Sequence, residues 1–456
     1  MTLGAAAAIA GAGDTIVAEA TVPGRGALAV IRLSGPRAHD ITRAIAEAWP
    51  SEPRVASLIQ LREPDGARLD QAIVLRYDAP SSFTGEDAVE ITTHGGTTVP
   101  ATVVAALIAA GARLAAPGEF TRRAVLNGKL DLLQAEAVAD IVAASSRAAQ
   151  RLALEQLDGG LSRRLLALRS DLLGLEALIA YDIDFPEEDD GPIPRERIME
   201  ALAALERSLD ELLATADAGE LVREGALVVL AGVPNAGKSS LFNALVGRRR
   251  AIVTDIPGTT RDAIEAVIDT GKWPLRLVDT AGLRAASEEV ERIGVEVSYE
   301  YLEQAAVVLV CGATDAEIDA ALAACAGRTT APLIVARTKR DLRSAAAPRS
   351  TTSVDVSAVT GAGIDELLAR ITNTLDHQFV AHPDAPVLTR ARHRERVAAA
   401  RAELKAFRKA WGGGEVPAIV AAVHLRTATI ALEELIGRVD VEAILDEVFS
   451  RFCVGK

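Results

Sequence analysis

The sequence is poor in aromatic residues and in cysteine, and both shortages narrow what the chain can be. Only 3% of its 456 residues are aromatic although 49% are hydrophobic, so Ala, Leu, Val and Ile must fill its cores. Three cysteines stand at positions 311, 325 and 453 without C-x-x-C spacing. This usage indicates a reducing compartment and argues against a structural zinc site.

Long apolar runs and excess positive charge are missing as well. The longest apolar run, about residues 99–110, is too short to span a bilayer, and the apolar N-terminus lacks the positive cluster of a signal peptide. A formal net charge of −14 argues against a protein that coats nucleic acid, although a local basic patch for RNA remains open. We expect a soluble, cytoplasmic protein, not a membrane protein, with about three domains.

The chain is organised around residues 227–239 (LVVLAGVPNAGKS). The apolar start of this segment predicts a buried parallel strand, and 240–246 has helical spacing. Between them, GVPNAGKS at 232–239 fits the phosphate-loop pattern better than a plain glycine turn. Its glycines let backbone N–H groups surround a phosphate at the positive end of a helix. Lys238 would reach the β- and γ-phosphates, and the Ser239 hydroxyl would bind Mg²⁺.

Three further motifs predict guanine as the base. A predicted strand ends in DTAG (279–282), whose Asp279 can hold Mg²⁺ through water while the glycine N–H contacts the γ-phosphate. Another strand leads into TKRD (338–341), where Asp341 can accept two hydrogen bonds from guanine that adenine does not offer. Ser357 and Ala358 follow a short strand and would place a backbone N–H against the guanine oxygen. The four motifs together favour GTP over ATP.

Two positions depart from the common GTPase pattern. Thr338 stands where Asn is commoner, which removes an amide that links the base site to the phosphate loop. Its hydroxyl can make part of that link, so we expect looser nucleotide binding with specificity retained. Leu283 stands where many small GTPases carry the Gln that orients the attacking water. Hydrolysis must therefore recruit another residue, a partner or a cation.

Periodicity divides the chain into an α+β domain (1–118), two helical segments (119–221 and 377–456) and an α/β domain (222–376) between them. The alternation in 222–376 predicts a doubly wound parallel sheet inserted into a helical domain. In the first domain the pattern predicts strands at 15–20, 27–33, 71–77 and 88–93, and helices at 36–49 and 97–110. Predicted helices in the helical segments cover 124–147, 149–179, 195–216, 391–410, 416–436 and 440–449.

Along nearly its whole length the chain resembles the bacterial tRNA modification GTPase MnmE (TrmE) family. The segment before Asp14 is longer than the resemblance predicts, and we assign it no function. Besides 232–239, the resemblance is carried by PGRG (23–26), SFTGED (82–87), PGEF (117–120), LNGKLDL (126–132), DIDFP (182–186), IVTDIPGTTRD (252–262), DTAGLR (279–284) and FCVGK (452–456).

The resemblance implies a tetrahydrofolate-binding N-terminal domain, a helical domain split in sequence and an inserted P-loop GTPase (G) domain. It implies a homodimer joined through the N-terminal domains, whose G domains meet when GTP is bound. It also implies a partner, the flavoprotein MnmG (GidA). Together they would add an aminomethyl or carboxymethylaminomethyl group to carbon 5 of the tRNA wobble uridine (U34), with a one-carbon unit from a tetrahydrofolate.

The resemblance implies that Ser239 and Thr260 hold Mg²⁺. It also implies a potassium ion held by Asn235, Thr254, Ile256 and Thr259. Thr254 and Ile256 would bind this ion through their backbone carbonyl groups. Such a cation can offset negative charge as an arginine finger does. The remaining GTP contacts that the resemblance implies are Ala236, Gly237, Lys238, Ser240, Asp255, Pro257, Gly258, Asp279, Thr280, Ala281, Gly282, Thr338, Lys339, Asp341, Ser357 and Ala358.

Glu291 matches the glutamate that orients the attacking water through a second water, although from the residue pattern alone it is an exposed helix carboxylate. Four further residues match contacts to 5-formyltetrahydrofolate: Arg32, Glu90, Lys129 and Lys456. A carboxylate suits the amide-like edge of a pterin, and cations suit the glutamate tail. Cys453 is a candidate for the one-carbon chemistry, with a structural or incidental thiol as the equal alternative.

Two other functions fit parts of the pattern. A ribosome-assembly GTPase switch shares the G-domain motifs, but it often carries an RNA-binding module with a G-x-x-G loop and a basic surface, and neither flanks this domain. A folate-dependent one-carbon transferase with a vestigial G domain conflicts with the intact phosphate loop. That transferase would turn over folate without GTP.

Overall fold

The computed structural model describes residues 13–184, 194–248, 251–252, 264–279, 300–342, 353–379, 386–412, 418–437, 452 and 455. The chain forms two compact units, one of residues 1–139 with 436–456 and the other of residues 140–435. Among the described residues no helix is both long and apolar enough to cross a membrane.

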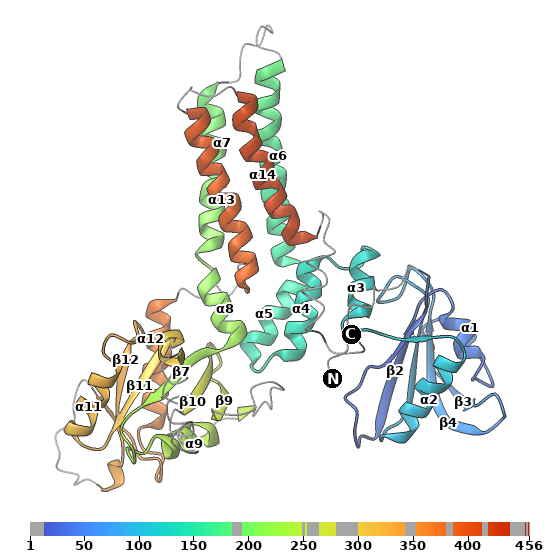
Figure 1. The fold of residues 1–456 in the computed structure, drawn as a ribbon, viewed down its shortest axis with the longest axis horizontal. Coiled ribbons are helices and arrows are strands. Elements are labelled where there is room, and N and C mark those ends of the chain that lie inside the picture. Colours follow the sequence, from blue (N-terminus) through green and yellow to red (C-terminus); the bar gives the residue numbers. More distant parts are fainter. Residues whose placement is uncertain are drawn as a thin grey trace, which may run out of the picture. The chain divides into compact units, whose positions relative to one another are not determined.

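A six-stranded sheet forms the centre of the first unit (Figure 1). Neighbouring strands are antiparallel except for the parallel pair β1 and β6. In spatial order the strands are β3 (Ser57–Arg62), β4 (Arg68–Tyr77), β5 (Ala88–His94), β2 (Leu28–Ser34), β1 (Ile16–Glu19) and β6 (Arg113–Leu114). The four predicted strands of this domain are confirmed, and β3 and β6 are additional.

Helices α1 (Ala38–Arg43) and α2 (Thr98–Ala109) cover one face of this sheet. Ile31 and Leu33 of β2 are buried beneath them in a cluster that includes Val103 of α2. Side chains alternate between the two faces of a strand, so Arg32 and Ser34 point to the opposite face. The register of β2 therefore decides which polar residues are available to a ligand.

The predicted helix 36–49 is wrong in its second half, because α1 ends at Arg43. The chain leaves the helix to join the sheet edge: Ala46 forms a bridge with Leu61, and the Glu47 N–H donates to the Gln60 carbonyl over 3.0 Å. Backbone pairing with a strand far along the sequence overrides the local helical pattern here.

The helical segments contain more breaks than periodicity predicts. Helix 124–147 is in fact two helices separated by residues 127–131, where Gly128 takes a left-handed φ of 68° that stops a helix. Helix 149–179 is likewise split in two, whereas helix 195–216 is confirmed over Arg195–Leu213. The segments are α3 (Glu119–Leu126), α4 (Leu132–Ala143), α5 (Arg147–Leu157), α6 (Gly160–Asp184), α7 (Arg195–Leu213), α8 (Ala216–Glu224), α13 (Ala391–Gly412) and α14 (Ala418–Ile436).

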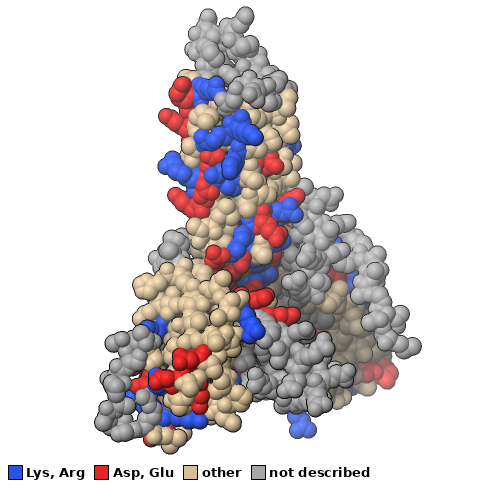
Figure 2. Space-filling model, turned by 60° about the vertical axis from the view of Figure 1, so that its left-hand side comes forward, with Lys and Arg blue, Asp and Glu red and all other residues tan. Residues whose placement is uncertain are grey.

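Long helices of the second unit are joined by ion pairs. Glu206 of α7 accepts hydrogen bonds from Arg401 and Arg408 of α13, and Arg169 of α6 pairs with Glu433 of α14. On the face drawn in Figure 2, positive and negative side chains are intermixed along these helices. The predicted helices 391–410 and 416–436 are confirmed, and 440–449 lies outside the described residues.

A seven-stranded sheet carries the phosphate loop. In spatial order its strands are β13 (Ser353–Asp355), β12 (Leu333–Arg337), β11 (Val307–Gly312), β7 (Ala226–Ala231), β10 (Pro274–Asp279), β9 (Ile264–Asp269) and β8 (Ala251–Ile252). The strands from β13 to β10 are parallel, as predicted. Strand β9 is antiparallel to β10, because only residues 270–273 connect the two and a parallel connection needs a dozen or more residues.

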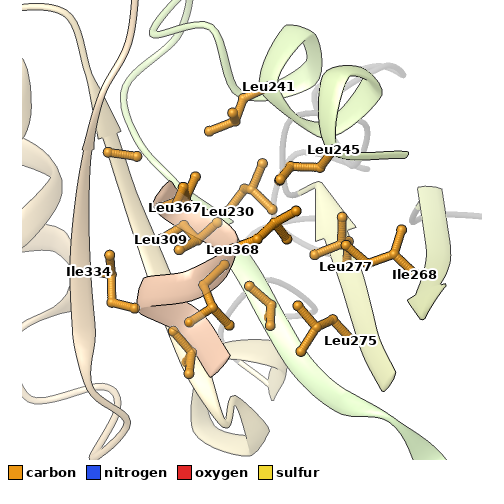
Figure 3. Packing of buried hydrophobic residues seen from close by; sticks show 14 of the residues in the cluster. Leu230, Leu241, Leu245, Ile268, Leu275, Leu277, Leu309, Ile334, Leu367 and Leu368 are labelled. Carbon is orange, nitrogen blue, oxygen red and sulfur yellow. The ribbon is translucent and has the colours of Figure 1, made fainter. Parts of the chain in front are cut away.

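Both faces of this sheet are covered by helices. One face packs against α9 (Lys238–Arg248) and α12 (Ile364–Gln378), and Figure 3 shows Leu241, Leu245, Leu367 and Leu368 meeting the strand side chains there. The other face packs against α11 (Asp315–Cys325). Every residue of the central strand β7 is buried, which explains its uninterrupted apolar sequence. The predicted α/β class is confirmed.

A cluster of charged groups ties β1, β6 and α3 together in the first unit. Glu119, which is 2% exposed, accepts hydrogen bonds from Arg113 (2.7 Å) and Arg123 (3.0 Å). Both arginines also donate to Asp14, each over 2.7 Å. Burial by itself raises the pKa of Glu119, but hydrogen bonds from Arg113, the Ala116 N–H and Arg123 outweigh it, so the pKa is lowered.

We predict that this cluster makes the first unit acid-sensitive. Because folding lowers the pKa of Glu119, its charge stabilises the fold above the ordinary value of 4.5, and this contribution is lost as the pH falls through the lowered value. Glu119→Gln should destabilise the unit at neutral pH by roughly 3 kcal/mol, since it leaves two arginines poorly paired. Protection of β1 amides against hydrogen exchange measures both effects.

The matched control is Glu52→Gln, at an exposed glutamate of the same unit. This control should keep the wild-type protection and its pH dependence. Equal protection of β1 in Glu119→Gln and in the wild type at neutral pH would contradict a structural role for the cluster.

Candidate functional site

The phosphate loop joins the end of β7 to the start of α9. Gly232 lies so close to β11 that a Cβ at this position would be 2.4 Å from the Cys311 carbonyl oxygen. No larger residue fits without moving the backbone. Asn235 takes a left-handed φ of 63°, and the chain then enters the first turn of α9 at Lys238. The loop therefore curves tightly at the carboxyl edge of the sheet, where α/β folds bind ligands.

Lys238 is 6% exposed, and its ammonium group points back into the loop. Its Nζ donates to the Gly232 carbonyl over 2.8 Å and to the Val233 carbonyl over 3.0 Å. A buried ammonium beside backbone N–H groups at a helix N-terminus is suited to a phosphate. Ser239 and Ser240 follow on the exposed side of the same turn.

Asp279 ends β10 beside the phosphate loop. It pairs in register with Leu230 of β7, and its side chain is only 2% exposed. Because β7 and β10 are parallel, their carboxyl ends meet at the same edge of the sheet. The Asp279 carboxylate thus lies where a cation beside the phosphates is expected.

Thr338 links the loop after β12 to the phosphate loop. Its hydroxyl donates to the Ala236 carbonyl over 2.6 Å, and its N–H donates to the Gly312 carbonyl at the end of β11 over 2.9 Å. The side chain is 3% exposed. The hydroxyl therefore makes the part of the link that the sequence predicts in place of the commoner Asn.

The loop after β12 and the loop after β13, which are the predicted base-binding loops, meet at Asp341 and Ser357. The buried Ser357 hydroxyl donates to Asp341 Oδ1 over 2.6 Å and accepts from the Thr360 N–H at 3.1 Å. This bond fixes one carboxylate oxygen, while Asp341 as a whole is exposed. Lys339, two residues before Asp341, is exposed with a left-handed φ of 57°, and Ala358 is half-buried next to Ser357.

The cysteine beneath the loop has no role in this chemistry. Cys311 is fully buried, and burial raises the pKa of its thiol to about 12. A thiol in that state is a poor nucleophile and packs as a small apolar residue.

Several predicted site residues lie outside the described part of the chain. For the nucleotide site these are Thr254, Asp255, Ile256, Pro257, Gly258, Thr259, Thr260, Thr280, Ala281, Gly282 and Glu291, and for the folate site and its chemistry Lys456 and Cys453. Gly455 packs on β1, where an added Cβ would be 2.6 Å from the Glu19 carbonyl oxygen.

A second candidate site lies on the face of the first sheet opposite α1 and α2. Arg32 and Glu90 are directly opposite each other on β2 and β5, and their side chains form an ion pair of 2.8 Å. The Tyr77 hydroxyl donates to the other Glu90 oxygen over 3.1 Å, and the Arg32 guanidinium stacks 5.6 Å from the Phe83 ring centre. Burial, followed by the Glu90 charge, raises the pKa of Tyr77.

These side chains line a cavity of about 130 Å³, to which Ser34, Thr84 and Ala88 also contribute. Lys129 is not part of its lining; its Nζ donates to the Pro80 carbonyl over 3.1 Å, in the loop that leads to Phe83. In the sequence, residues 82–87 (SFTGED) carry the family resemblance but do not by themselves indicate a contact with Arg32. The pairing of β2 with β5 brings this segment to Arg32, and no local signal in Tyr77 or Phe83 indicates that contact.

Comparison with known proteins gives consistent results over both units. Two family models match the chain: the GTP-binding protein TrmE N-terminus over residues 15–129 and the MnmE helical domain over residues 132–453. The tRNA modification GTPase MnmE of Azoarcus sp. (strain BH72) is 44% identical, with 97% of this chain and 98% of the relative covered. The tRNA modification GTPase MnmE of Heliobacterium modesticaldum is 42% identical, with 97% and 100% covered.

Among solved structures, the G domain of the T. maritima FeoB iron transporter is 28% identical, with 33% of this chain and 98% of that chain covered and a TM-score of 0.27.

The geometry of Asp341 predicts how the base preference can be changed. In Asp341→Asn an amide donor replaces one carboxylate oxygen and faces the guanine 2-amino group, which is also a donor. Affinity for GTP should fall on the order of 100-fold. Affinity for xanthosine triphosphate should rise, because xanthine carries a carbonyl at that position. Competition of each nucleotide against a fluorescent guanine nucleotide measures both affinities and thus the change in base preference.

The matched control is Asp365→Asn, at an exposed aspartate of α12 that pairs with Arg248. It should leave both affinities unchanged. If Asp341→Asn loses affinity for both nucleotides to the same extent, this carboxylate supports the fold and does not recognise the base.

Proposed function

The chain belongs to the MnmE family of tRNA modification GTPases, and from this premise we propose that it uses GTP hydrolysis to drive modification of carbon 5 of the tRNA wobble uridine. Identity of 44% along 97% of the chain carries this proposal. The geometry supports it, because the phosphate loop, Asp279 and the base loops lie at one edge of one sheet.

In the proposed nucleotide site, the backbone of residues 232–238 surrounds the phosphates and the Lys238 ammonium neutralises part of their charge. Asp341 recognises guanine, with Ser357 holding its carboxylate. Ser239 and Thr260 would bind Mg²⁺, and Asp279 would hold that ion through water. The ion would offset charge that develops on the phosphates. Thr338 in place of Asn would loosen nucleotide binding without changing the base preference.

Leu283 cannot orient the attacking water, so the site needs another source of catalysis. We assign this role to a potassium ion held by Asn235, Thr254, Ile256 and Thr259 and to Glu291, which would orient the water. Asn235 is an exposed residue of the phosphate loop, so its amide is accessible to such an ion. Dimerisation of two G domains would complete the site.

The cavity beside Arg32 and Glu90 is the proposed tetrahydrofolate site. A carboxylate and a guanidinium stacked on an aromatic ring suit the amide-like edge and the flat ring of a pterin. At about 130 Å³ the cavity is smaller than sites for whole drug-sized ligands. It would hold one end of 5-formyltetrahydrofolate, with Lys129 and Lys456 contacting the rest.

The proposed assembly is a homodimer joined through the N-terminal domains, working in the cytoplasm with the flavoprotein MnmG (GidA) on tRNA. The tetrahydrofolate would supply the one-carbon unit, and Cys453 is the candidate residue for that chemistry. The proposed domains are residues 1–118, the helical parts 119–221 and 377–456, and the G domain 222–376.

The potassium proposal predicts faster GTP hydrolysis in KCl than in NaCl at equal ionic strength. We expect a stimulation on the order of tenfold or more, because the cation replaces an arginine finger. The stimulation should grow with protein concentration as G domains meet, and Asn235→Ala should abolish it.

Asn373→Ala, at an exposed asparagine of α12, is the matched control and should respond to potassium like the wild type. Equal rates in the two salts would reject a cation-assisted mechanism for this chain and leave an activating partner to supply the missing group.

A further inference from the structure

Three potential metal ligands meet where β4 and β5 end beside α1. His39 comes from α1, Asp78 directly follows β4, and Asp87 directly precedes β5. One donor atom from each side chain lies within 4.8 Å of the other two. His39 Nε2 is 3.8 Å from Asp78 Oδ1, and His39 Nδ1 is 3.9 Å from Asp87 Oδ2. None of the functions discussed above uses these residues.

The imidazole of His39 is held in the orientation of a metal ligand. Its Nε2 lies 3.1 Å from the Tyr77 carbonyl oxygen, and a carbonyl can only accept, so Nε2 carries the hydrogen. The Trp49 ring packs against the imidazole edge-on at 5.4 Å. Nδ1 therefore faces Asp87 across 3.9 Å, which is too long for a hydrogen bond. Metal-binding histidines are commonly fixed by such a bond from the other ring nitrogen to a carbonyl.

One oxygen of each carboxylate is directed at the imidazole of His39. Asp87 Oδ1 accepts from the Ala79 N–H over 2.8 Å, which leaves Oδ2 directed at His39. Asp78 Oδ1 is buried, and no described residue donates a hydrogen bond to it. Arg76 approaches only the other oxygen of Asp78, at 3.9 Å. A buried carboxylate oxygen without a donor is costly, and a cation at this centre would satisfy it.

We propose that His39, Asp78 and Asp87 bind one divalent transition-metal ion such as Zn²⁺. One imidazole and two carboxylates suit such ions, whereas Mg²⁺ and Ca²⁺ prefer oxygen ligands alone. Zinc lies about 2.0–2.2 Å from its ligands, so two ligands on one ion are at most about 4.4 Å apart. The distance of 3.9 Å from His39 Nδ1 to Asp87 Oδ2 meets this limit. The 3.8 Å from Asp78 Oδ1 is measured to Nε2, so Asp78 would join the ion by turning its side chain toward Nδ1.

Solvent can complete the coordination, because the Asp78 side chain is 47% exposed and the Asp87 side chain is 36% exposed. The ion joins α1 to the ends of β4 and β5. Tyr77 and Ala88, the neighbours of the two aspartates, line the cavity that contains Arg32. The metal thus stabilises the strand ends from which that cavity is built.

The test uses untagged full-length protein, freed of nucleotide and treated with chelator. Titration with Zn²⁺ by calorimetry, and with Co²⁺ by its visible absorption, should reveal one equivalent bound through His39. His39→Gln and Asp87→Asn should each weaken this binding at least about tenfold, because a ligand is lost. Circular dichroism checks that both variants are folded.

His94→Gln is the matched control. This histidine ends β5 in the same sheet, and its Nδ1 is hydrogen-bonded to a single carboxylate, Asp70, at 2.7 Å. Its removal should leave metal affinity unchanged. The proposal is overturned if the wild type takes up no metal. It is equally overturned if His39→Gln binds metal as tightly as the wild type.

Discussion

A buried hydrogen bond from the Thr338 hydroxyl to the Ala236 carbonyl joins two halves of the proposed nucleotide site that are 102 residues apart in sequence. The phosphate loop follows the central strand β7, whereas Thr338 follows β12, on the far side of β11. Only their common position at the carboxyl edge of a parallel sheet brings them together. Recognition of the base and binding of the phosphates therefore depend on the packing of this sheet, with apolar side chains on both of its faces.

The parts of the fold that could be predicted from sequence are those whose signal is local. Strand β7 and the strand before Thr338 each contain an apolar run that leads into a loop with a recognisable polar pattern, and the structure agrees with both. The early end of α1 could not be predicted, because pairing of Ala46 with Leu61 decides it. The same holds for the Arg32–Glu90 pair, whose partners are 58 residues apart and meet only through strand register.

Charge in this acidic chain is used mainly in pairs. In the first unit, Arg113 and Arg123 hold Asp14 and Glu119 in place, and in the second, Arg401 holds Glu206 and Asp210. His39, Asp78 and Asp87 differ from these groups, because the basic group between the two carboxylates is an imidazole and not a guanidinium. The net charge of −14 thus says little about any one surface, and local geometry decides what each charged group can bind.

Coupling of the nucleotide site to tRNA is tested most directly by wobble-uridine analysis in bacteria that lack their own enzyme of this family. Mass spectrometry of their tRNA should show the modified uridine restored by this chain. Lys238→Ala removes the ammonium from the phosphate loop and should not restore the modification, although the protein accumulates to the same level. Equal modification with Lys238→Ala and the wild type would contradict a role for GTP hydrolysis in this chemistry.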